Sequence, residues 1–361
     1  MTEPAPRRRR SLPAQIEESA EAAIERTPSF TDADLLPSGS TLLNLACSGR
    51  VAGAFRKKKM VNLIGDSSSG KSLLSMQCLI EACFCKHFDG YELYYDDVEG
   101  GCDFNIHDMY GERAAAAADD RIQFISSASV EEWQDRMQDL QKREAKFIYI
   151  LDSYDVLDSV QAKAQAEAEA KARAAGKEVS GSYGMDKVKR IRALFRPAIA
   201  AMKKTDSIVI VISQTKAVID PRSFKKKTRS AEDALEFHSY HCVWLANAGK
   251  EVSKEIDIGT KTRLQVKKNR LTGRRREVSF SIFTEIGIDD IGSCIDFMVE
   301  KGFWKQPKQT IEAHDLGLTG TKQKLIREIE SGNKERALRR AVGKAWQEVE
   351  ESVRLCRKDR Y

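Results

Sequence analysis

The sequence has neither a long hydrophobic run nor a regular pattern of cysteines. Its longest strand-like apolar stretch, Ser207–Ser213, is far shorter than the ~18–20 residues of a membrane-spanning helix. The arginines Arg7–Arg10 are not followed by the apolar core of a secretory signal peptide. The eight cysteines include no Cys-x-x-Cys pair, which favours reduced thiols. We therefore expect a cytosolic protein that neither spans a membrane nor depends on disulfides.

The composition is that of a globular protein with a modest net charge. The 361 residues are 41% hydrophobic and 32% charged, and 60 basic against 54 acidic residues leave a net charge of +6. This amount of apolar material excludes a wholly disordered chain. At roughly 150 residues per domain, the length suggests about two domains or one large core with appendages.

The basic residues are concentrated in two segments. Residues 261–276 contain eight lysines and arginines and no acidic residue, and residues 215–230 contain six against one aspartate. Such concentrated charge is typical of a surface that binds a polyanion. Two solvated loops would have the same composition, so the composition alone leaves both interpretations open.

Short β-branched or aromatic runs alternate with longer helical stretches between residues 58 and 283. This alternation predicts an α/β fold with a mainly parallel, twisted sheet that is covered by helices on both faces. The last three runs are not separated by helices, which predicts an antiparallel extension of the sheet. The runs are Val61–Ile64, Glu92–Tyr95, Ile122–Ile125, Phe147–Leu151, Ile208–Ile212, Cys242–Ala246, Arg263–Val266 and Val278–Phe283.

Composition also predicts three regions along the chain. Residues 1–40 are rich in Pro, Arg, Glu and Ala and are interpreted as an N-terminal arm, residues 41–304 as the core, and residues 305–361 as a small, basic, helix-rich C-terminal domain. Residues 161–178 are strong helix formers without a large apolar side chain. They predict a solvated helix that protrudes from the core.

The strongest motif is a P-loop, G-x-x-x-x-G-K-S, placed between a predicted strand and a predicted helix. A loop of small residues lets backbone N–H groups surround a phosphate, and the helix N-terminus adds partial positive charge. Lys71 would reach the β- and γ-phosphates of ATP, and the Ser72 hydroxyl would ligate Mg²⁺. The motif consists of Gly65, Asp66, Ser67, Ser68, Ser69, Gly70, Lys71 and Ser72.

Polar residues at the ends of three later strands complete the predicted site. Asp152 ends the apolar run that begins at Phe147 and is interpreted as the second Mg²⁺ residue, acting through water, although an Asp that only begins a turn is the alternative. Glu99 would orient the attacking water as a general base. Gln214 would sense the γ-phosphate, although a Gln after a strand is more often a turn residue.

The ordered set of motifs resembles the RecA recombinases. The P-loop is followed by Asp97-x-Glu99, Leu151-Asp152-Ser153 and Ile212-Ser213-Gln214 in the order of that family. The similarity extends over roughly residues 36–305. Further matches are Ser38-Gly39-Ser40-Thr41-Leu42-Leu43-Asn44, Ala234-Leu235-Glu236-Phe237, Val266-Lys267-Lys268-Asn269-Arg270 and Glu300-Lys301-Gly302-Phe303-Trp304.

The resemblance implies roles for individual residues. Glu99 matches the catalytic glutamate, and Gln214 matches the glutamine that couples the γ-phosphate to the DNA-binding loop behind it. Lys268 and Arg270 match two lysines that reach the ATP of a neighbouring subunit across a filament interface, and the second is arginine here. Such residues make hydrolysis depend on assembly. ATP and Mg²⁺ are the implied ligands.

The same resemblance assigns basic segments of the chain to DNA-binding loops. Residues 177–190 and 215–232 occupy the positions of the two DNA-binding loops, and cations with interspersed aromatics suit single-stranded DNA. The first loop supplies Tyr183, Lys187, Lys189 and Arg190, and the second supplies Arg222, Phe224, Lys225, Lys226, Lys227 and Arg229.

Several positions depart from the family pattern. A glycine pair is replaced by Ala231 and Glu232, which puts the geometry of the second loop and its response to ATP in doubt. Two tyrosines that stack on adenine fall on Ile106 and Thr284, so the base preference is expected to be relaxed. Divergence of this kind suggests a phage or mobile-element relative in a bacterial cytosol.

The predicted function is therefore ATP-dependent homologous recombination. The protein would form filaments on single-stranded DNA, pair it with homologous duplex DNA and exchange strands, with DNA-stimulated ATP hydrolysis. Its partners would be DNA and further copies of itself, with single-strand-binding or loader proteins as additional candidates and no membrane. Two alternatives remain: a hexameric helicase or DNA motor on the same fold, and a slowly hydrolysing ATP- and DNA-binding regulator of recombination.

Overall fold

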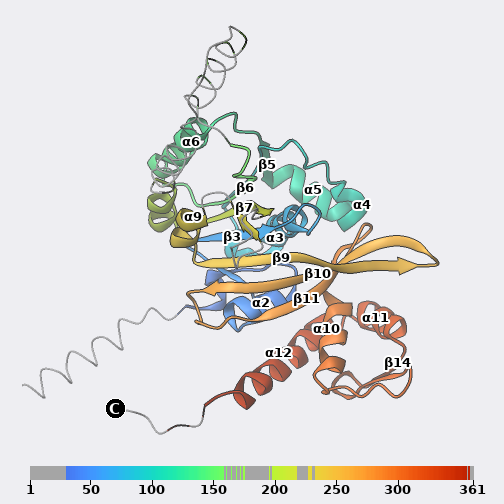
Figure 1. Ribbon diagram of the computed structural model, residues 1–361. Helices are drawn as coiled ribbons and strands as arrows, with labels where there is room; N and C mark the ends of the chain where they lie inside the picture. Colours follow the sequence, from blue (N-terminus) through green and yellow to red (C-terminus); the bar gives the residue numbers. More distant parts are fainter. Residues whose placement is uncertain are drawn as a thin grey trace, which may run out of the picture.

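The computed structural model describes residues 30–157, 197–217, 227–229 and 232–355, together with a few single positions. Its centre is a sheet in the order β12-β11-β10-β9-β3-β7-β6-β4-β5, and β8 pairs with the end of β7. Neighbouring strands from β9 to β5 are parallel. These are β3 (Lys59–Gly65), β4 (Glu92–Asp97), β5 (Ile122–Ile125), β6 (Phe147–Asp152), β7 (Ile208–Ala217) and β9 (His241–Ser253). The predicted parallel core is confirmed (Figure 1).

Both faces of the central parallel strands β3, β4, β6 and β7 are buried, which explains their continuous apolar runs. Alternate side chains point to opposite faces, so Ile148 and Ile150 join one hydrophobic cluster while Tyr149 and Leu151 join the other. The first cluster includes α2 (Thr41–Ser48), α3 (Lys71–Phe84) and α5 (Glu112–Arg121), and the second includes α6 (Val130–Lys142), part of the helical residues 197–205 and Leu235 of α9 (Glu232–His238).

The predicted antiparallel extension is also confirmed. It consists of β9, β10 (Ile256–Asn269), β11 (Glu277–Phe283) and β12 (Gly287–Asp289). The hairpin of β9 and β10 projects beyond the rest of the sheet (Figure 1). Buried and exposed residues alternate along the second half of β10, as expected where only one face of a sheet is covered.

The described start of the chain lies on the core. Strand β1 (Leu35–Leu36) follows the 3₁₀ turn η1 (Asp32–Asp34) and pairs with β2 (Phe55–Arg56), and both of its leucines are buried. Residues 1–29 lie outside the described residues, and so does most of the helix predicted over 161–178. The domain boundaries at residues 40 and 304 stay predictions.

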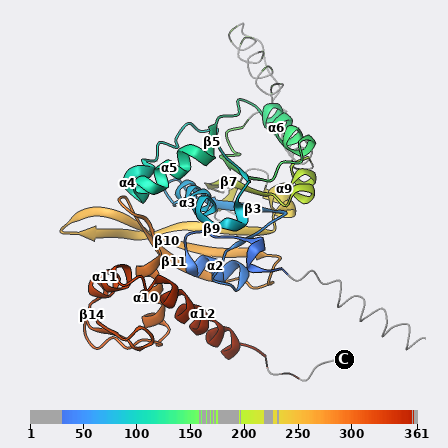
Figure 2. The same ribbon diagram turned by 180° about the vertical axis from the view of Figure 1, so that it is seen from behind.

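The C-terminal region forms a further layer below the sheet, and its buried side chains belong to the first hydrophobic cluster (Figure 2). The Phe297 ring of α10 stacks on Trp346 of α12 with centroids 5.7 Å apart, and the buried Trp304 donates from Nε1 to Asp315 at 2.9 Å. The region contains α10 (Asp290–Glu300), β13 (Ile311–Ala313), η3 (His314–Leu316), β14 (Leu318–Gly320), α11 (Lys322–Ser331) and α12 (Glu335–Ser352). No helix in the described part of the chain has the length and apolar character to span a membrane.

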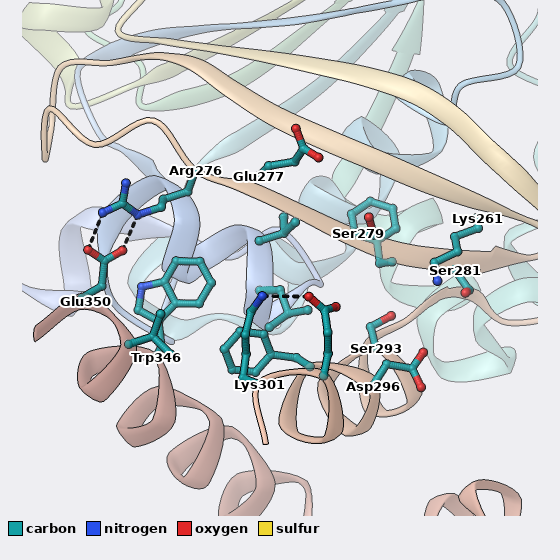
Figure 3. Close-up of a pocket in the computed structure, with 16 residues that line it drawn as sticks. Lys261, Arg276, Glu277, Ser279, Ser281, Ser293, Asp296, Lys301, Trp346 and Glu350 are labelled. Atoms are coloured by element: carbon teal, nitrogen blue, oxygen red, sulfur yellow. Dashed lines mark hydrogen bonds and ion pairs between the residues drawn. The ribbon is translucent and has the colours of Figure 1, made fainter. Parts of the chain in front are cut away.

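A cavity of about 390 Å³ is lined by residues of β11, α10 and α12. Figure 3 shows Arg276, the residue before β11, facing Glu350 of α12. The Nε–Oε1 and Nη2–Oε2 distances are 2.5 and 2.6 Å. Arg276 lowers the pKa of Glu350. The pair fastens α12 to the sheet at one end of the cavity. The remaining elements are η2 (Lys86–Phe88), α4 (Ile106–Tyr110) and β8 (Lys227–Arg229).

Candidate active site

The carboxyl edge of the parallel sheet collects the residues that were predicted from four separate segments. Gly65 at the end of β3 pairs with Gln214 of β7, and Asp97 of β4 pairs with Asp152 of β6. In an open parallel sheet the carboxyl ends of the strands share one edge, which is where ligands bind. The P-loop, Asp152, Glu99 and Gln214 therefore surround one site.

The P-loop needs both of its glycines for reasons of space. A Cβ on Gly65 would lie 2.4 Å from the Leu245 carbonyl oxygen, and a Cβ on Gly70 would lie 2.4 Å from Ile282 Cδ1. Gly70 also has φ +90°, a left-handed conformation that side chains rarely adopt. The loop thus folds tightly against β9 and β11 before α3 begins at Lys71.

Lys71 is 7% exposed and points back across the loop. Its Nζ donates to the Asp66 carbonyl oxygen at 2.6 Å. Burial lowers the pKa of Lys71, and the nearby carboxylates of Asp152 and Glu99 oppose that shift. A buried ammonium group at the N-terminus of a helix fits a phosphate, because an anion there would balance both charges.

Two threonines from distant strands hold the loop, and no local sequence pattern indicates either of them. The Thr215 hydroxyl of β7 donates to Asp66 Oδ1. The Thr262 hydroxyl of β10 donates to the Ser69 carbonyl oxygen at 3.3 Å. These contacts hold the P-loop motif in place from both sides, and such preorganisation lowers the entropic cost of binding a ligand.

Asp152 lies beside the start of α3 and is 4% exposed. The Tyr95 hydroxyl donates to its Oδ2 at 2.7 Å. Burial raises the pKa of Asp152, whereas hydrogen bonds from Ser72 and Tyr95 lower it. The described residues contain no cluster of three or more acidic, His or Cys ligands. One carboxylate and one hydroxyl nevertheless fit Mg²⁺, which in nucleotide sites keeps several waters and uses phosphate oxygens.

Glu99 is exposed at the mouth of the site, and three groups fix its position. Its Oε1 accepts hydrogen bonds from Ser153 Oγ at 2.6 Å and from Gln214 Nε2, and its backbone N–H donates to the Asp152 carbonyl oxygen at 3.3 Å. The preceding Asp97 accepts from the backbone N–H groups of residues 100–102 at 2.9–3.2 Å. A carboxylate held in this way can orient a water molecule.

Gln214 joins this carboxylate to the base of the second predicted DNA-binding segment. Its backbone N–H donates to Asp155 Oδ2 at 2.6 Å while its side chain contacts Glu99. Strand β7 then continues to Ala217 and pairs with β8, so Thr215 lies opposite Arg229. A loop was predicted over 215–232, but its two ends form an antiparallel ribbon, because β7 extends beyond its apolar run.

The structure does not bring Lys268 and Arg270 to this site. Lys268 pairs with Cys242, and Cys242 pairs with Asn62 of β3. Asn62 lies three residues before Gly65 along that strand. Its Nζ donates to the Glu236 carbonyl oxygen. Arg270 is exposed, and its backbone N–H donates to Tyr240 O at 3.1 Å. Both residues face the amino edge of the sheet.

Most of the predicted DNA-binding side chains lie outside the described residues. This holds for all four residues of the first loop and for Arg222, Phe224, Lys225 and Lys226 of the second. For Lys227 and Arg229 the structure describes the backbone, which forms β8. Ile106 begins α4 and packs partly buried against the first hydrophobic cluster, and the base preference stays a prediction.

The sequence is similar to those of known RecA proteins. The sequence model of the RecA N-terminal domain matches residues 21–289. Protein RecA of Thioalkalivibrio sulfidiphilus is 25% identical over 275 residues, which cover 75% of this chain and 72% of the relative. Protein RecA of Rhodopseudomonas palustris is 24% identical over 276 residues, covering 75% and 71%. Protein RecA of Methylococcus capsulatus is 25% identical over 268 residues, covering 74% and 70%.

Proposed function

The chain belongs to the RecA family, and we propose that it is a DNA-dependent ATPase that forms filaments on single-stranded DNA and exchanges strands with homologous duplex DNA. The contact of Gln214 with Glu99 carries this proposal. It joins the predicted general base directly to the strand that enters a predicted DNA-binding segment. Through this contact, binding of DNA to that segment would change the position of Glu99.

The proposed hydrolysis follows from the groups at the carboxyl edge. Mg²⁺, held by Ser72 and indirectly by Asp152, would neutralise charge on the β- and γ-phosphates. Glu99 accepts a proton from water as the water oxygen bonds to the γ-phosphorus, and the bond from that phosphorus to the bridging oxygen breaks. Lys71 balances the negative charge left on the phosphates. The products are ADP and inorganic phosphate.

Assembly would complete this site. Within one chain Lys268 and Arg270 lie at the far edge of the sheet, so they serve a nucleotide only if that nucleotide belongs to another copy. A head-to-tail interface of this kind gives a helical filament when its rotation does not close, and a ring when it does. Hydrolysis would then require neighbours, and DNA would promote it by aligning them.

Two experiments test the proposal. Electron microscopy of the full chain with single-stranded DNA and a non-hydrolysable ATP analogue should show helical filaments, whereas closed six-membered rings would identify a motor instead. ATP hydrolysis should rise on addition of single-stranded DNA and should be lost in Lys71→Ala. DNA-stimulated hydrolysis that survives in Lys71→Ala would contradict the assignment of the site.

A further inference from the structure

A second cavity, of about 330 Å³, lies where the first half of α12 meets α2 and α3. Figure 1 shows α12 beneath α2, away from the carboxyl edge of the sheet. Arg336, Arg339 and Arg340 of α12 line the cavity, and Glu81 of α3 is the one carboxylate among the described residues that do so. We call this cavity the arginine pocket. It has the size of a small-molecule site and an excess of positive charge.

The three arginines share one face of α12. Residues three and four apart are neighbours on a helix, so Arg336 lies next to both Arg339 and Arg340. Like charges at this spacing destabilise a helix, and Arg336 also belongs to the first turn, where the helix dipole disfavours a cation. The stability of α12 therefore does not explain this set of charges.

Arg339 is held in place by the core. Its Nε lies 3.3 Å from Asp290 Oδ2. Asp290 in turn accepts hydrogen bonds from the backbone N–H and the hydroxyl of Thr41 at 2.6 and 2.8 Å. Burial raises the pKa of Glu81, and Arg339 opposes that shift. One guanidinium group of the pocket is thus positioned by carboxylates of the chain itself.

The other two arginines are not paired in this way. Arg336 and Arg340 are exposed, and neither forms an ion pair with any residue that the structure describes. By contrast, Arg274 and Arg276 pair with Glu350 of the same helix at 3.1 and 2.5 Å. Two unpaired cations beside a cavity create a positive potential that attracts an anion.

That anion is not the nucleotide bound at the P-loop. Helix α3 begins at Lys71, and Glu81 follows ten residues later, so about 15 Å of helix separates the pocket from the P-loop at a rise of about 1.5 Å per residue. The wall formed by Pro37, Val51 and Ala52 adds no charge. A concave pocket with cations on one side suits a small anion, whereas nucleic acids are bound along extended basic surfaces.

We infer that the arginine pocket binds a small anion that carries phosphate groups, with Arg336 and Arg340 donating to the phosphate oxygens beside the fixed Arg339. Arginine suits this ligand because its planar guanidinium group donates two parallel hydrogen bonds to one phosphate. The bound anion would add contacts between α12 and the core and would stabilise the attachment of the C-terminal region.

The test uses pyrophosphate as the probe and calorimetric titration of the full chain as the measurement. The unmodified chain should bind two equivalents and Lys71→Ala one, because Lys71 belongs to the P-loop only. Lys71→Ala/Arg336→Gln/Arg340→Gln should bind this second equivalent at least about tenfold more weakly. The matched control, Lys71→Ala/Lys305→Gln/Arg327→Gln, removes two exposed cations that do not line the pocket. It should bind as Lys71→Ala does.

Thermal unfolding provides a second measurement. Glutamine is a good helix former, so the variants should fold. Pyrophosphate should raise the midpoint of unfolding of Lys71→Ala, and this increase should be lost in the variant that also lacks Arg336 and Arg340. If that variant is unfolded, Lys71→Ala/Arg340→Gln takes its place and should bind pyrophosphate about threefold more weakly than Lys71→Ala.

Three outcomes would overturn the inference. The first is that Lys71→Ala binds no pyrophosphate. The second is an equal weakening in the control variant, since binding would then follow total charge rather than the pocket. The third is that loss of Arg336 and Arg340 leaves pyrophosphate binding intact and weakens binding to duplex DNA, which would identify a nucleic-acid surface. None of these affects the proposed ATPase, which fails instead if Lys71→Ala binds as many equivalents as the unmodified chain.

Discussion

The polar side chains at the two edges of the parallel sheet differ in whether they have hydrogen-bond or ion-pair partners within the chain. At the carboxyl edge, Lys71, Glu99 and Asp152 all have partners within the chain. At the amino edge, Lys59 and Arg270 form no ion pair with a described residue, and the Lys59 ammonium lies 4.7 Å from the centroid of the Tyr240 ring. The first edge is ordered by contacts within the chain, whereas the second carries the exposed cation Arg270. The difference suggests that each chain supplies two unlike halves of a shared site.

The largest loss of ATP hydrolysis should follow from replacing Arg270, which is proposed to act on the nucleotide of a neighbouring copy. Arg270→Ala should lower DNA-stimulated ATP hydrolysis at saturating protein by about 10³-fold, as the loss of an arginine finger does. Nucleotide binding by the unassembled chain should be unchanged. Steady-state hydrolysis and equilibrium nucleotide binding measure the two quantities. Equal losses in both would place Arg270 at its own P-loop and remove the contrast between the edges.

The general base gives the next largest effect. Glu99→Gln keeps an oxygen that accepts from Ser153 but cannot take a proton, so hydrolysis should fall by about 10²-fold. Filaments with ATP should persist longer, because release would depend on hydrolysis. Single-turnover hydrolysis and filament lifetime test this prediction. A Glu99→Gln protein with normal turnover would show that another group activates the water.

Replacing Gln214 should change the stimulation of ATP hydrolysis by DNA more than it changes hydrolysis itself. Gln214→Ala removes the side-chain link between Glu99 and β7, so stimulation of hydrolysis by DNA should fall about tenfold, within the usual range of coupling energies. Hydrolysis without DNA should change little. The ratio of the two rates is the measurement. A uniform loss at both conditions would mean that Gln214 acts only by positioning Glu99.

The smallest predicted effect concerns the stability of the amino edge. His241 is fully buried, and its Nε2 lies 3.1 Å from Asn269 Oδ1 and 3.3 Å from the Cys47 carbonyl oxygen. Burial lowers the pKa of His241 to about 4. The unfolded chain binds this proton near pH 6.5, so between these values the unfolded state holds more protons and stability falls as pH falls.

Protonation of His241 in the unfolded chain should lower the free energy of unfolding by roughly 1 kcal/mol as the pH falls from 7 to 5.5. Denaturant titrations at several pH values measure it. His241→Asn should be less stable overall but should lose this part of the pH dependence. An unchanged slope in the variant would assign the titration to other groups.

Local patterns predicted the fold well because they depend on neighbouring residues. The apolar run of β6 and the P-loop between β3 and α3 can be recognised within a few residues. Thr262 could not be recognised, because its contact with Ser69 spans 193 residues and depends on the position of β10. Tyr95 was likewise predicted as a strand residue, and only the pairing of β4 with β6 brings its hydroxyl to Asp152.

In the proposed filament, two copies of the chain build one nucleotide site. Lys71→Ala should be inactive because it binds no nucleotide, and Lys268→Ala/Arg270→Ala should be inactive because it cannot act on a neighbour. ATP hydrolysis on single-stranded DNA should therefore be measured for an equimolar mixture of the two. We predict that activity reappears, because mixed filaments contain intact P-loops facing intact cations. A mixture no more active than its separate components would contradict the account.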